Sequence, residues 1–148
     1  ISDNTVPLTD RQRVTQIKAA VAAGLIVYGE VGSKETLSNP ELLIAQAKSC
    51  FEAGSALVLV EAAELVQRGR LKMKTVDLLR RHLDMSRVMI ELPGPWISDV
   101  RSCDVEDMKK ALVHAIGPDI NLANVPPGSI IDTEATRTGL GTAGPLKA

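Results

Sequence analysis

Three glutamates lie about thirty residues apart, and each ends a short run of mostly apolar residues. The runs with their acids are Leu25 to Gly29 with Glu30, Ala56 to Val60 with Glu61, and Arg87 to Ile90 with Glu91. Carboxylates that gather in one place repel one another unless a cation or a basic side chain neutralises them. Oxygen ligands suit a hard divalent ion, so we expect all three glutamates to bind Mg²⁺. The alternative is that each one caps a helix or pairs with a nearby basic residue.

A lysine follows the first of these acids closely. Lys34 comes four residues after Glu30, and Gly32 between them permits a tight turn. The amine would then lie over the site, where Lys34 and Glu30 are the candidate catalytic residues for proton transfer. Lys34 would alternatively bind an anion, or be a solvated loop lysine.

Five further polar residues are candidates for binding a small anionic substrate, namely Ser2, Asp3, Asn121, Asn124 and Arg137. The two asparagines flank the end of a fourth apolar run and supply neutral donors that suit a carboxylate or enolate oxygen. Arg137 is a candidate anion clamp. For the two asparagines, the alternative is that they bond to loop backbone. For Ser2 and Asp3 it is a plain loop or cap, and Arg137 would alternatively be an ordinary surface arginine.

The thirty-residue period is that of a β-strand followed by its returning helix. The predicted strands are the three runs above and Ile120 to Ala123, with Ile1 to Asp3 as the tail of an earlier strand. The predicted helices run from Leu8 to Ala23, Asn39 to Ala53, Lys74 to Leu83, Val105 to Ile116 and Ser129 to Thr138. We expect Asp104 to cap the fourth helix, Ala62 to Leu71 to be a loop, and Gly141 to Ala148 to be a mobile tail.

This alternation predicts an α/β fold with right-handed crossovers. Two forms compete, a (β/α)8 TIM barrel and an open doubly wound sheet. No glycine-rich dinucleotide motif follows a predicted strand, so the dinucleotide-binding version of the open sheet has no support. A barrel requires about 250 residues, so these 148 residues would form one partial domain, roughly its C-terminal half to two-thirds. A missing N-terminal segment, a partner chain or a further copy in a homo-oligomer would then cover the open sheet edges.

Composition argues against several classes of function. The net charge is −1, the pI is near 6.2 and no basic stripe is present, so neither nucleic acid nor an anionic membrane is an expected partner. Cys50 and Cys103 lack metal-ligand spacing, which indicates reduced thiols in a cytoplasmic protein. His82 and His114 fall within predicted helices, and no nucleophile–histidine–acid triad is evident.

Six short motifs, taken in their order, carry a resemblance to a known family. They are Ile1-Ser2-Asp3, Glu30-Val31-Gly32-x-Lys34, Val58-Leu59-Val60-Glu61, Ile90-Glu91-x-Pro93, Asn121-Leu122-Ala123-Asn124 and Glu134-x-x-Arg137-x-Gly139-Leu140. Together they resemble the phosphosulfolactate synthase family across nearly the whole chain. The resemblance implies a (β/α)8 barrel in which this chain corresponds to the part from the end of strand four onward.

The family adds sulfite to phosphoenolpyruvate with Mg²⁺, giving phosphosulfolactate on a route to coenzyme M. By the resemblance, Lys34 matches the lysine proposed to exchange a proton with the substrate carbon. Glu30, Glu61 and Glu91 match acids at the strand ends, which would hold Mg²⁺ or order the site. Mg²⁺ would stabilise the enolate-like carboxylate that forms when the nucleophile adds.

Cationic groups that the family usually carries are absent here at three places. Ala63 occupies the position two residues after Glu61 where the family usually has an arginine. Near the C-terminus, Gly139 to Ala143 lacks the arginine of the family's Gly-Leu-Arg-Gly-Asp stretch. After the third predicted run, Gly94 to Ser98 replaces a lysine and glutamines. These departures predict a less anionic substrate or a loss of activity. Two other hypotheses are a non-catalytic barrel relative that acts in stress or assembly, and a half-barrel subunit of a two-chain enzyme.

Overall fold

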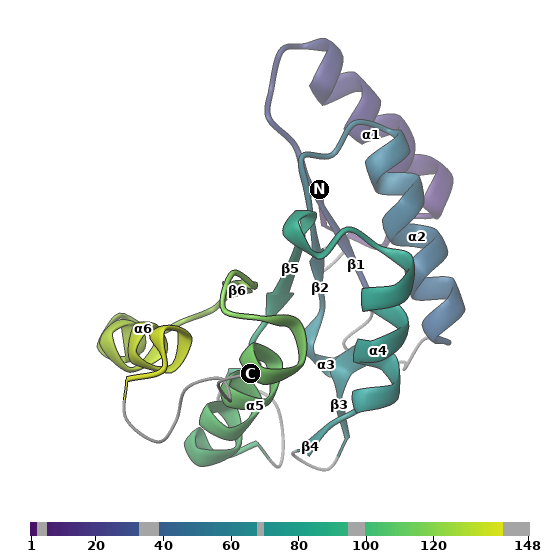
Figure 1. Ribbon diagram of the computed structural model, residues 1–148. Helices are drawn as coiled ribbons and strands as arrows, with labels where there is room; N and C mark the ends of the chain where they lie inside the picture. The colour runs from purple at the N-terminus through teal and green to yellow at the C-terminus, as the bar shows by residue number, and fades with distance from the viewer. Residues whose placement is uncertain (3–5, 33–38, 68–69, 95–99, 141–148) are drawn as a thin grey trace.

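A computed structural model describes residues 1–2, 6–32, 39–67, 70–94 and 100–140 of the chain (Figure 1). The helices are α1 (Asp10–Ala22), α2 (Pro40–Glu52), α3 (Ala62–Leu65), α4 (Met73–His82), η1 (Met85–Arg87), α5 (Ser102–Ile116), η2 (Pro127–Ser129) and α6 (Ile130–Thr138). The strands are β1 (Tyr28–Val31), β2 (Leu57–Val60), β3 (Val66–Gln67), β4 (Arg70–Leu71), β5 (Val88–Glu91) and β6 (Asn121–Ala123). The predicted α/β class is confirmed.

The main sheet is parallel throughout, and its strands follow one another in chain order, β1-β2-β5-β6. Ile1 extends it beyond β1, because its nitrogen donates to the Tyr28 carbonyl (2.6 Å) and its carbonyl accepts from the Glu30 amide (3.0 Å). These two bonds are the pattern of a parallel ladder, so Ile1 is the strand tail that the sequence predicts. A doubly wound sheet reverses its strand order, and the described strands show no such reversal.

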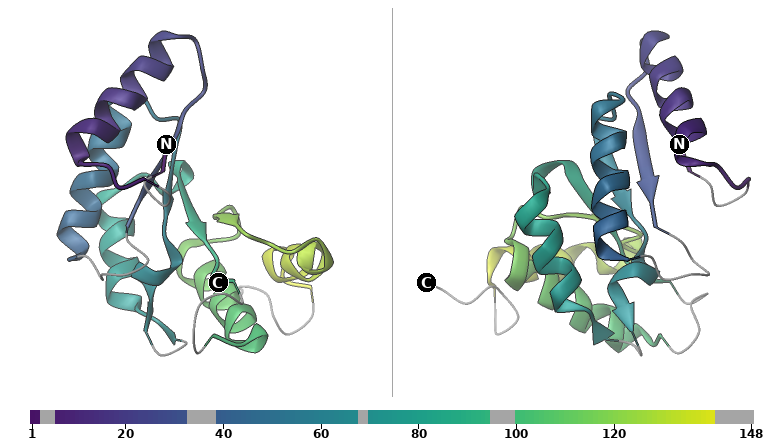
Figure 2. Two further views of the ribbon diagram at one scale, coloured as in Figure 1. Left: turned by 180° about the vertical axis from the view of Figure 1, so that it is seen from behind. Right: turned by 90° about the vertical axis from the view of Figure 1, so that its right-hand side faces the viewer.

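One face of this sheet is buried beneath helices. Val31, Val58, Val60, Val88 and Ile90 alternate along the strands and are at most 1% exposed. Helix α2 packs on β1 and β2 and lies between α1 and α4, as the two views in Figure 2 show.

The close approach of α2 to β1 depends on a glycine in the strand. A Cβ atom on Gly29 would lie 3.0 Å from the Cys50 sulfur and 3.1 Å from the Ser55 hydroxyl. Both distances are tighter than ordinary van der Waals contact, so a larger residue would require the side chains of Cys50 and Ser55 to shift.

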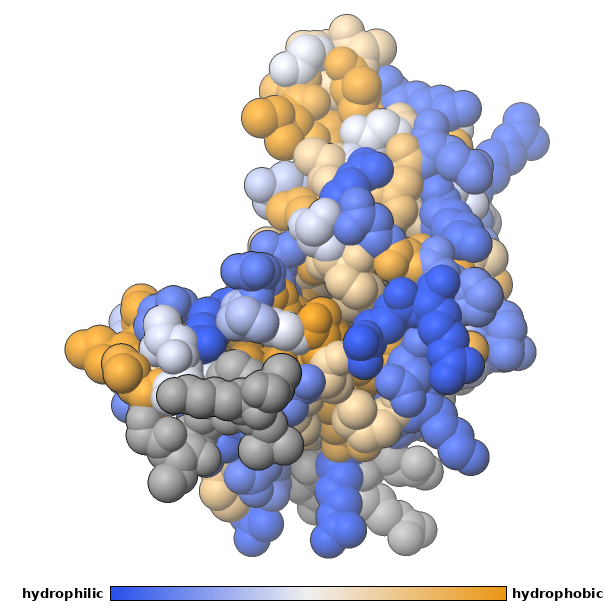
Figure 3. All heavy atoms as spheres, viewed as in Figure 1, coloured by the Kyte–Doolittle hydropathy of each residue, from blue (hydrophilic) through white to orange (hydrophobic). Residues whose placement is uncertain are grey.

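The opposite face of the sheet is only partly buried. Glu30, Leu59, Met89 and Asn121 lie in one row across the four strands, and all are half-buried. Figure 3 shows apolar side chains at two extremities of the molecule, the turn after α1 and helix α6. The large exposed residues there include Leu25, Ile26, Ile130 and Ile131. None of the described helices is long and apolar enough to span a membrane.

The first predicted strand was placed too early in the chain. Strand β1 is Tyr28–Val31, so Glu30 lies inside the strand and does not follow it. Gly24, at φ 80°, ends α1, and the Leu25 amide donates back to the Ala20 carbonyl (3.1 Å). The apolar residues that follow this turn therefore lead the chain back to the sheet before pairing begins.

Two other predicted features need correction. The segment predicted as a loop from Ala62 to Leu71 contains helix α3 and the antiparallel pair β3–β4, whose strands of two residues are too short to show a period. Helix α5 begins at Ser102, three residues before the predicted start. Asp104 lies inside it and accepts from the Arg101 amide at 2.9 Å, which caps the helix from its first turn.

Candidate active site

The three spaced glutamates meet at the carboxyl ends of β1, β2 and β5. One oxygen of Glu30, one of Glu61 and one of Glu91 lie within 4.8 Å of one another. Glu30 pairs in register with Leu59, two residues before Glu61, so the alternation of the strand places both acids on the same face. The sequence prediction that the three side chains would converge is confirmed.

The environment of these acids suits a divalent cation. Glu61 is 3% exposed, and the Oε2 atom of Glu91 is buried without a hydrogen-bond partner among the described residues. Carboxylates that lie close together repel one another, and burial deprives their charges of solvent. A hard cation with oxygen ligands relieves both effects, so these residues fit the Mg²⁺ that the sequence predicts.

Asn124 fixes one of the three carboxylates. Its Nδ2 donates to Oε1 of Glu91 at 2.7 Å and to the Leu92 carbonyl at 3.3 Å. The residue adopts φ 59°, a left-handed conformation that asparagine tolerates better than most residues. This contact engages Oε1 and leaves Oε2 of Glu91 as the available acceptor.

A fourth acid, Glu64, lies beside the cluster. It is 2% exposed, and its amide donates to the Glu61 carbonyl at 3.1 Å in the turn that begins α3. A Cβ atom on Gly32 would lie 2.8 Å from Cγ of Glu64 and 2.9 Å from Cβ of Glu61. Gly32 also has φ 104°, so glycine is required twice over at this contact. Glu64 was not among the predicted site residues, although its spacing of three from Glu61 is about one helical turn.

A cavity of about 580 Å³ lies next to Asn124, between the carboxyl ends of β5 and β6 and the start of α5. Its apolar wall consists of Pro93, Val100, Val105 and Pro126. Its polar lining includes Arg101, Ser102, Glu106, Asn124 and Ser129. Because Asn124 lines the cavity and also donates to Glu91, the cavity adjoins the carboxylate cluster.

The charged side chains at this cavity are paired along α5. The Arg101 guanidinium donates to both oxygens of Asp104, at 2.9 and 3.0 Å. These bonds raise the pKa of Arg101 and lower the pKa of Asp104 to about 2. Glu106 likewise pairs with the buried ammonium of Lys109 at 2.7 Å.

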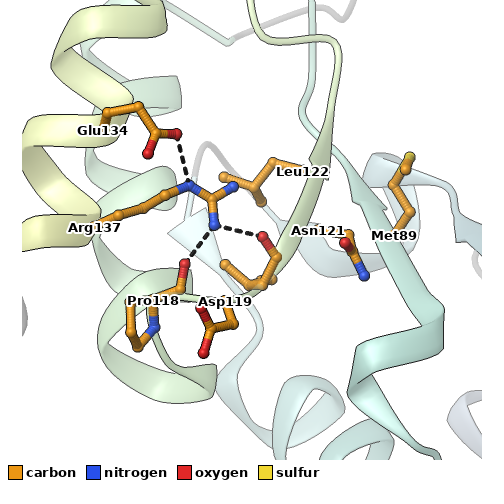
Figure 4. A pocket seen from close by; sticks show the side chains of 8 residues that line it. Met89, Pro118, Asp119, Asn121, Leu122, Glu134 and Arg137 are labelled. Carbon is orange, nitrogen blue, oxygen red and sulfur yellow. Dashed lines mark hydrogen bonds and ion pairs between the residues drawn. The ribbon is translucent and has the colours of Figure 1, made fainter.

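Two predicted substrate-binding residues contact backbone at the amino ends of β5 and β6. Arg137 reaches from α6 to the turn before β6, where its Nη1 donates to the carbonyls of Pro118 and Ile120 (Figure 4). The Nδ2 atom of Asn121 donates to the Ser86 carbonyl at 2.9 Å and to the Val88 carbonyl at 3.1 Å. Both side chains thus hold backbone at the amino ends of β5 and β6, and the substrate-binding roles predicted for them stay predictions.

The remaining predicted residues stand as follows. Ser2 is exposed and comes directly after Ile1, which pairs at the level of Gly29, so Ser2 continues alongside Glu30. Lys34, Asp3 and the tail from Gly141 to Ala148 are outside the part of the chain that the structure describes. The roles predicted for Lys34 and Asp3 therefore stay predictions.

Comparison with known proteins gives consistent matches. The family model described as (2R)-phospho-3-sulfolactate synthase (ComA) matches residues 1–142. A phosphosulfolactate synthase of Methanothermobacter thermautotrophicus is 30% identical over 95% of this chain and 54% of the relative. Proteins of the same name from Bacillus subtilis and Methanocaldococcus jannaschii are 27% and 26% identical over 95% of this chain, and over 55% and 56% of their own lengths. The chain thus spans about half the length of these relatives.

Proposed function

The chain belongs to the (2R)-phospho-3-sulfolactate synthase (ComA) family, and from that premise we propose that it carries half of a Mg²⁺-dependent synthase site. The reaction is the addition of sulfite to phosphoenolpyruvate or to a related small unsaturated carboxylate. The sheet in chain order is part of a barrel, which further strands complete beyond its two edges. This arrangement puts the carboxyl ends of the strands at the mouth, where barrel enzymes hold their chemistry.

The observation that carries the proposal is the convergence of Glu30, Glu61 and Glu91, whose oxygens lie within 4.8 Å of one another. Acids at strand ends that served only as helix caps or partners of surface cations would have no reason to face each other. Here, Glu61 is only 3% exposed, and it packs closely against Gly32, which has no side chain.

These three glutamates would hold Mg²⁺, which when bound supplies positive charge to stabilise the negative charge that develops on the substrate carboxylate. Asn124 orients Glu91 through its hydrogen bond to Oε1. The packing of Glu61 and Glu64 against Gly32 fixes the first turn of α3 under the site. Lys34, which follows this glycine by two residues, would deliver the proton to the substrate carbon after sulfite has added.

The proposal is tested by following sulfite consumption by the intact protein, with phosphoenolpyruvate and with unsaturated carboxylates that carry no phosphate. We expect consumption that requires Mg²⁺ and stops on chelation. Lys34→Ala is expected to lower kcat at least about 100-fold, the usual contribution of a positioned proton donor. Lys18→Ala removes an exposed lysine of α1 and serves as the matched control.

The outcome that contradicts the proposal is equally specific. If no acceptor is consumed in a Mg²⁺-dependent reaction, or if Lys34→Ala and Lys18→Ala are equally active, the enzyme interpretation fails. The non-catalytic relative predicted as an alternative from the sequence would then be the better description.

A further inference from the structure

The cavity beside Asn124 differs in character from the carboxylate cluster that it adjoins. We propose that it holds an uncharged, apolar substituent of the acceptor, at the place where phosphoenolpyruvate carries its phosphate. The preferred acceptor is then a 2-alkyl or 2-aryl propenoate, an unsaturated acid with one negative charge. This inference rests on the proposed function for the reaction type and names the substrate class of the same site.

The cavity lies directly beside the carboxylate cluster. Asn124 lines the cavity and donates to Glu91 at 2.7 Å, so the cavity begins where the cluster ends. A small acid whose carboxylate lies at the cluster has its carbon 2 within a few bond lengths of this boundary. The group on that carbon is the part of the molecule that the cavity is placed to accept.

The charged side chains that line the cavity do not suit a second anionic group. A phosphate dianion is usually bound by arginine or lysine side chains that direct several donors at it. Among the described residues that line the cavity, Arg101 is the only basic one, and its guanidinium already donates twice to Asp104. Glu106 adds a negative charge to the same lining, and its partner Lys109 is 1% exposed. The described lining thus offers no unpaired positive charge to a second anionic group.

One wall of the cavity is apolar. Pro93, Val100, Val105 and Pro126 form one wall of the cavity, and Val105 also packs against the hydrophobic core. Each Å² of apolar surface that a ligand buries there contributes about 25 cal/mol to binding. A volume of about 580 Å³ is within the range of small-molecule sites and holds a phenyl or branched alkyl group.

The chemistry balances with this class of acceptor. The sulfur of hydrogen sulfite forms a bond to carbon 3 of the propenoate, and the π bond between carbons 2 and 3 breaks. Its electron pair moves toward the carboxylate, and carbon 2 then gains a proton. The proton that hydrogen sulfite loses matches the proton gained at carbon 2, so the product is a 2-substituted 3-sulfopropanoate and no external oxidant or reductant is needed.

The test measures binding of saturated analogues, which cannot react. The affinities of 2-methylpropanoate, 2-phenylpropanoate and 2-phospholactate for the intact protein with Mg²⁺ are compared by titration calorimetry without sulfite. We expect 2-phenylpropanoate to bind at least about 10-fold more tightly than 2-phospholactate, since a buried phenyl group covers enough apolar surface for that difference. We expect the affinity of 2-methylpropanoate to lie between the affinities of the other two ligands.

Charge substitutions in the cavity sharpen the comparison. Val105→Lys introduces an ammonium into the apolar wall and is expected to reverse the order of the two ligands. Val100→Lys introduces the same charge from a half-buried position outside the helices, in case the first variant folds poorly. Ile26→Lys, at a position 83% exposed before β1, is the matched control and should keep the original order.

Two results would overturn the inference. The first is 2-phospholactate binding as tightly as 2-phenylpropanoate, or more tightly, to the unsubstituted protein. The second is that none of the three acids binds. A failure of the proposed function looks different, because the acids would then bind in the expected order while no propenoate or phosphoenolpyruvate consumed sulfite.

Discussion

Polar side chains at the two ends of the parallel sheet are used in different ways. At the amino ends, three side chains donate to backbone carbonyls. Arg87 bonds to Ser55 at 2.7 Å and lies over the Phe51 ring, Asn121 bonds to Ser86 and Val88, and Arg137 bonds to Pro118 and Ile120. These contacts satisfy carbonyls where strands begin, so they stabilise the turns that feed the sheet.

At the carboxyl ends, the charged side chains face one another instead. Glu30, Glu61 and Glu91 converge, and Asn124 adds its amide to the same group. Such an arrangement costs stability unless a cation or a basic side chain compensates for it. The described contacts at one end of this sheet thus stabilise the fold, and the other end carries the side chains to which we assign the proposed function.

The largest expected effect comes from removing one charge at the carboxyl end. Glu61→Gln keeps the shape of the side chain and removes its charge, and we expect the affinity for Mn²⁺, used as a probe for Mg²⁺, to fall at least about 100-fold. Calorimetric titration measures it, with the exposed Glu52→Gln on α2 as the control. Unchanged affinity in Glu61→Gln would show that the cluster does not bind the metal.

Truncation at the amino end should act on stability alone. Arg137→Ala leaves two carbonyls without their charged donor, and we expect the free energy of unfolding to fall by about 2 kcal/mol, or about 30-fold in the unfolding constant. Urea unfolding measures this change, and Mn²⁺ affinity should stay the same. Arg80→Ala is the control, since its pair with Asp77 at 3.9 Å is exposed and contributes at most about 0.5 kcal/mol.

A different result for Arg137 would break the comparison between the two ends. If Arg137→Ala keeps its stability and loses substrate affinity, the residue belongs to the site, as the sequence suggested.

A pair of substitutions at Asn124 tests how Glu91 is oriented. Asn124→Gly keeps the left-handed backbone and removes the amide, so Mn²⁺ affinity is expected to fall about 10-fold while stability changes little. Asn124→Ala should show the same loss of affinity and an added cost of about 1 kcal/mol, because alanine disfavours φ 59°. Equal stability of the two variants would mean that the backbone relaxes. Unchanged affinity in both would mean that the hydrogen bond to Glu91 has no role in metal binding.

The smallest expected effect concerns Asp104, beside the cavity. Its hydrogen bonds from Arg101 lower the pKa from 3.8 to about 2, so the carboxylate stabilises the folded state above the ordinary pKa. This contribution is lost as the pH falls through the folded-state pKa. The urea midpoint of Asp104→Asn should therefore be slightly lower than that of the unsubstituted protein at pH 6, and the two should converge toward pH 2. A difference that persists at low pH would indicate that charge is not the cause.

The sequence was informative where a residue's role follows from its place along a strand. The period of the three glutamates predicted both the α/β class and the convergence of the acids, because parallel strands bring their carboxyl ends to one edge. Asn124 was correctly placed near the acids for the same reason. Asn121, three residues earlier, was not, because its position beside the start of β5 depends on pairing that no local pattern records.

Other features were not predictable from local patterns. The contact of Arg137 with the turn before β6 depends on where α6 packs, which is a tertiary property. Glu64 was not predicted as a site residue, because α3 has four residues, fewer than a periodic signal requires. The cavity beside Asn124 is formed by three separate segments of chain, so its charge balance became visible only in the folded structure.

The central claim is that Glu30, Glu61 and Glu91 form a divalent metal site. Anomalous diffraction from a crystal of the protein equilibrated with Mn²⁺ locates the ion directly. We predict one strong peak within coordinating distance of carboxylate oxygens from all three glutamates, which disappears in Glu61→Gln. A fully occupied ion elsewhere, with no peak between these three carboxylates, would contradict the account.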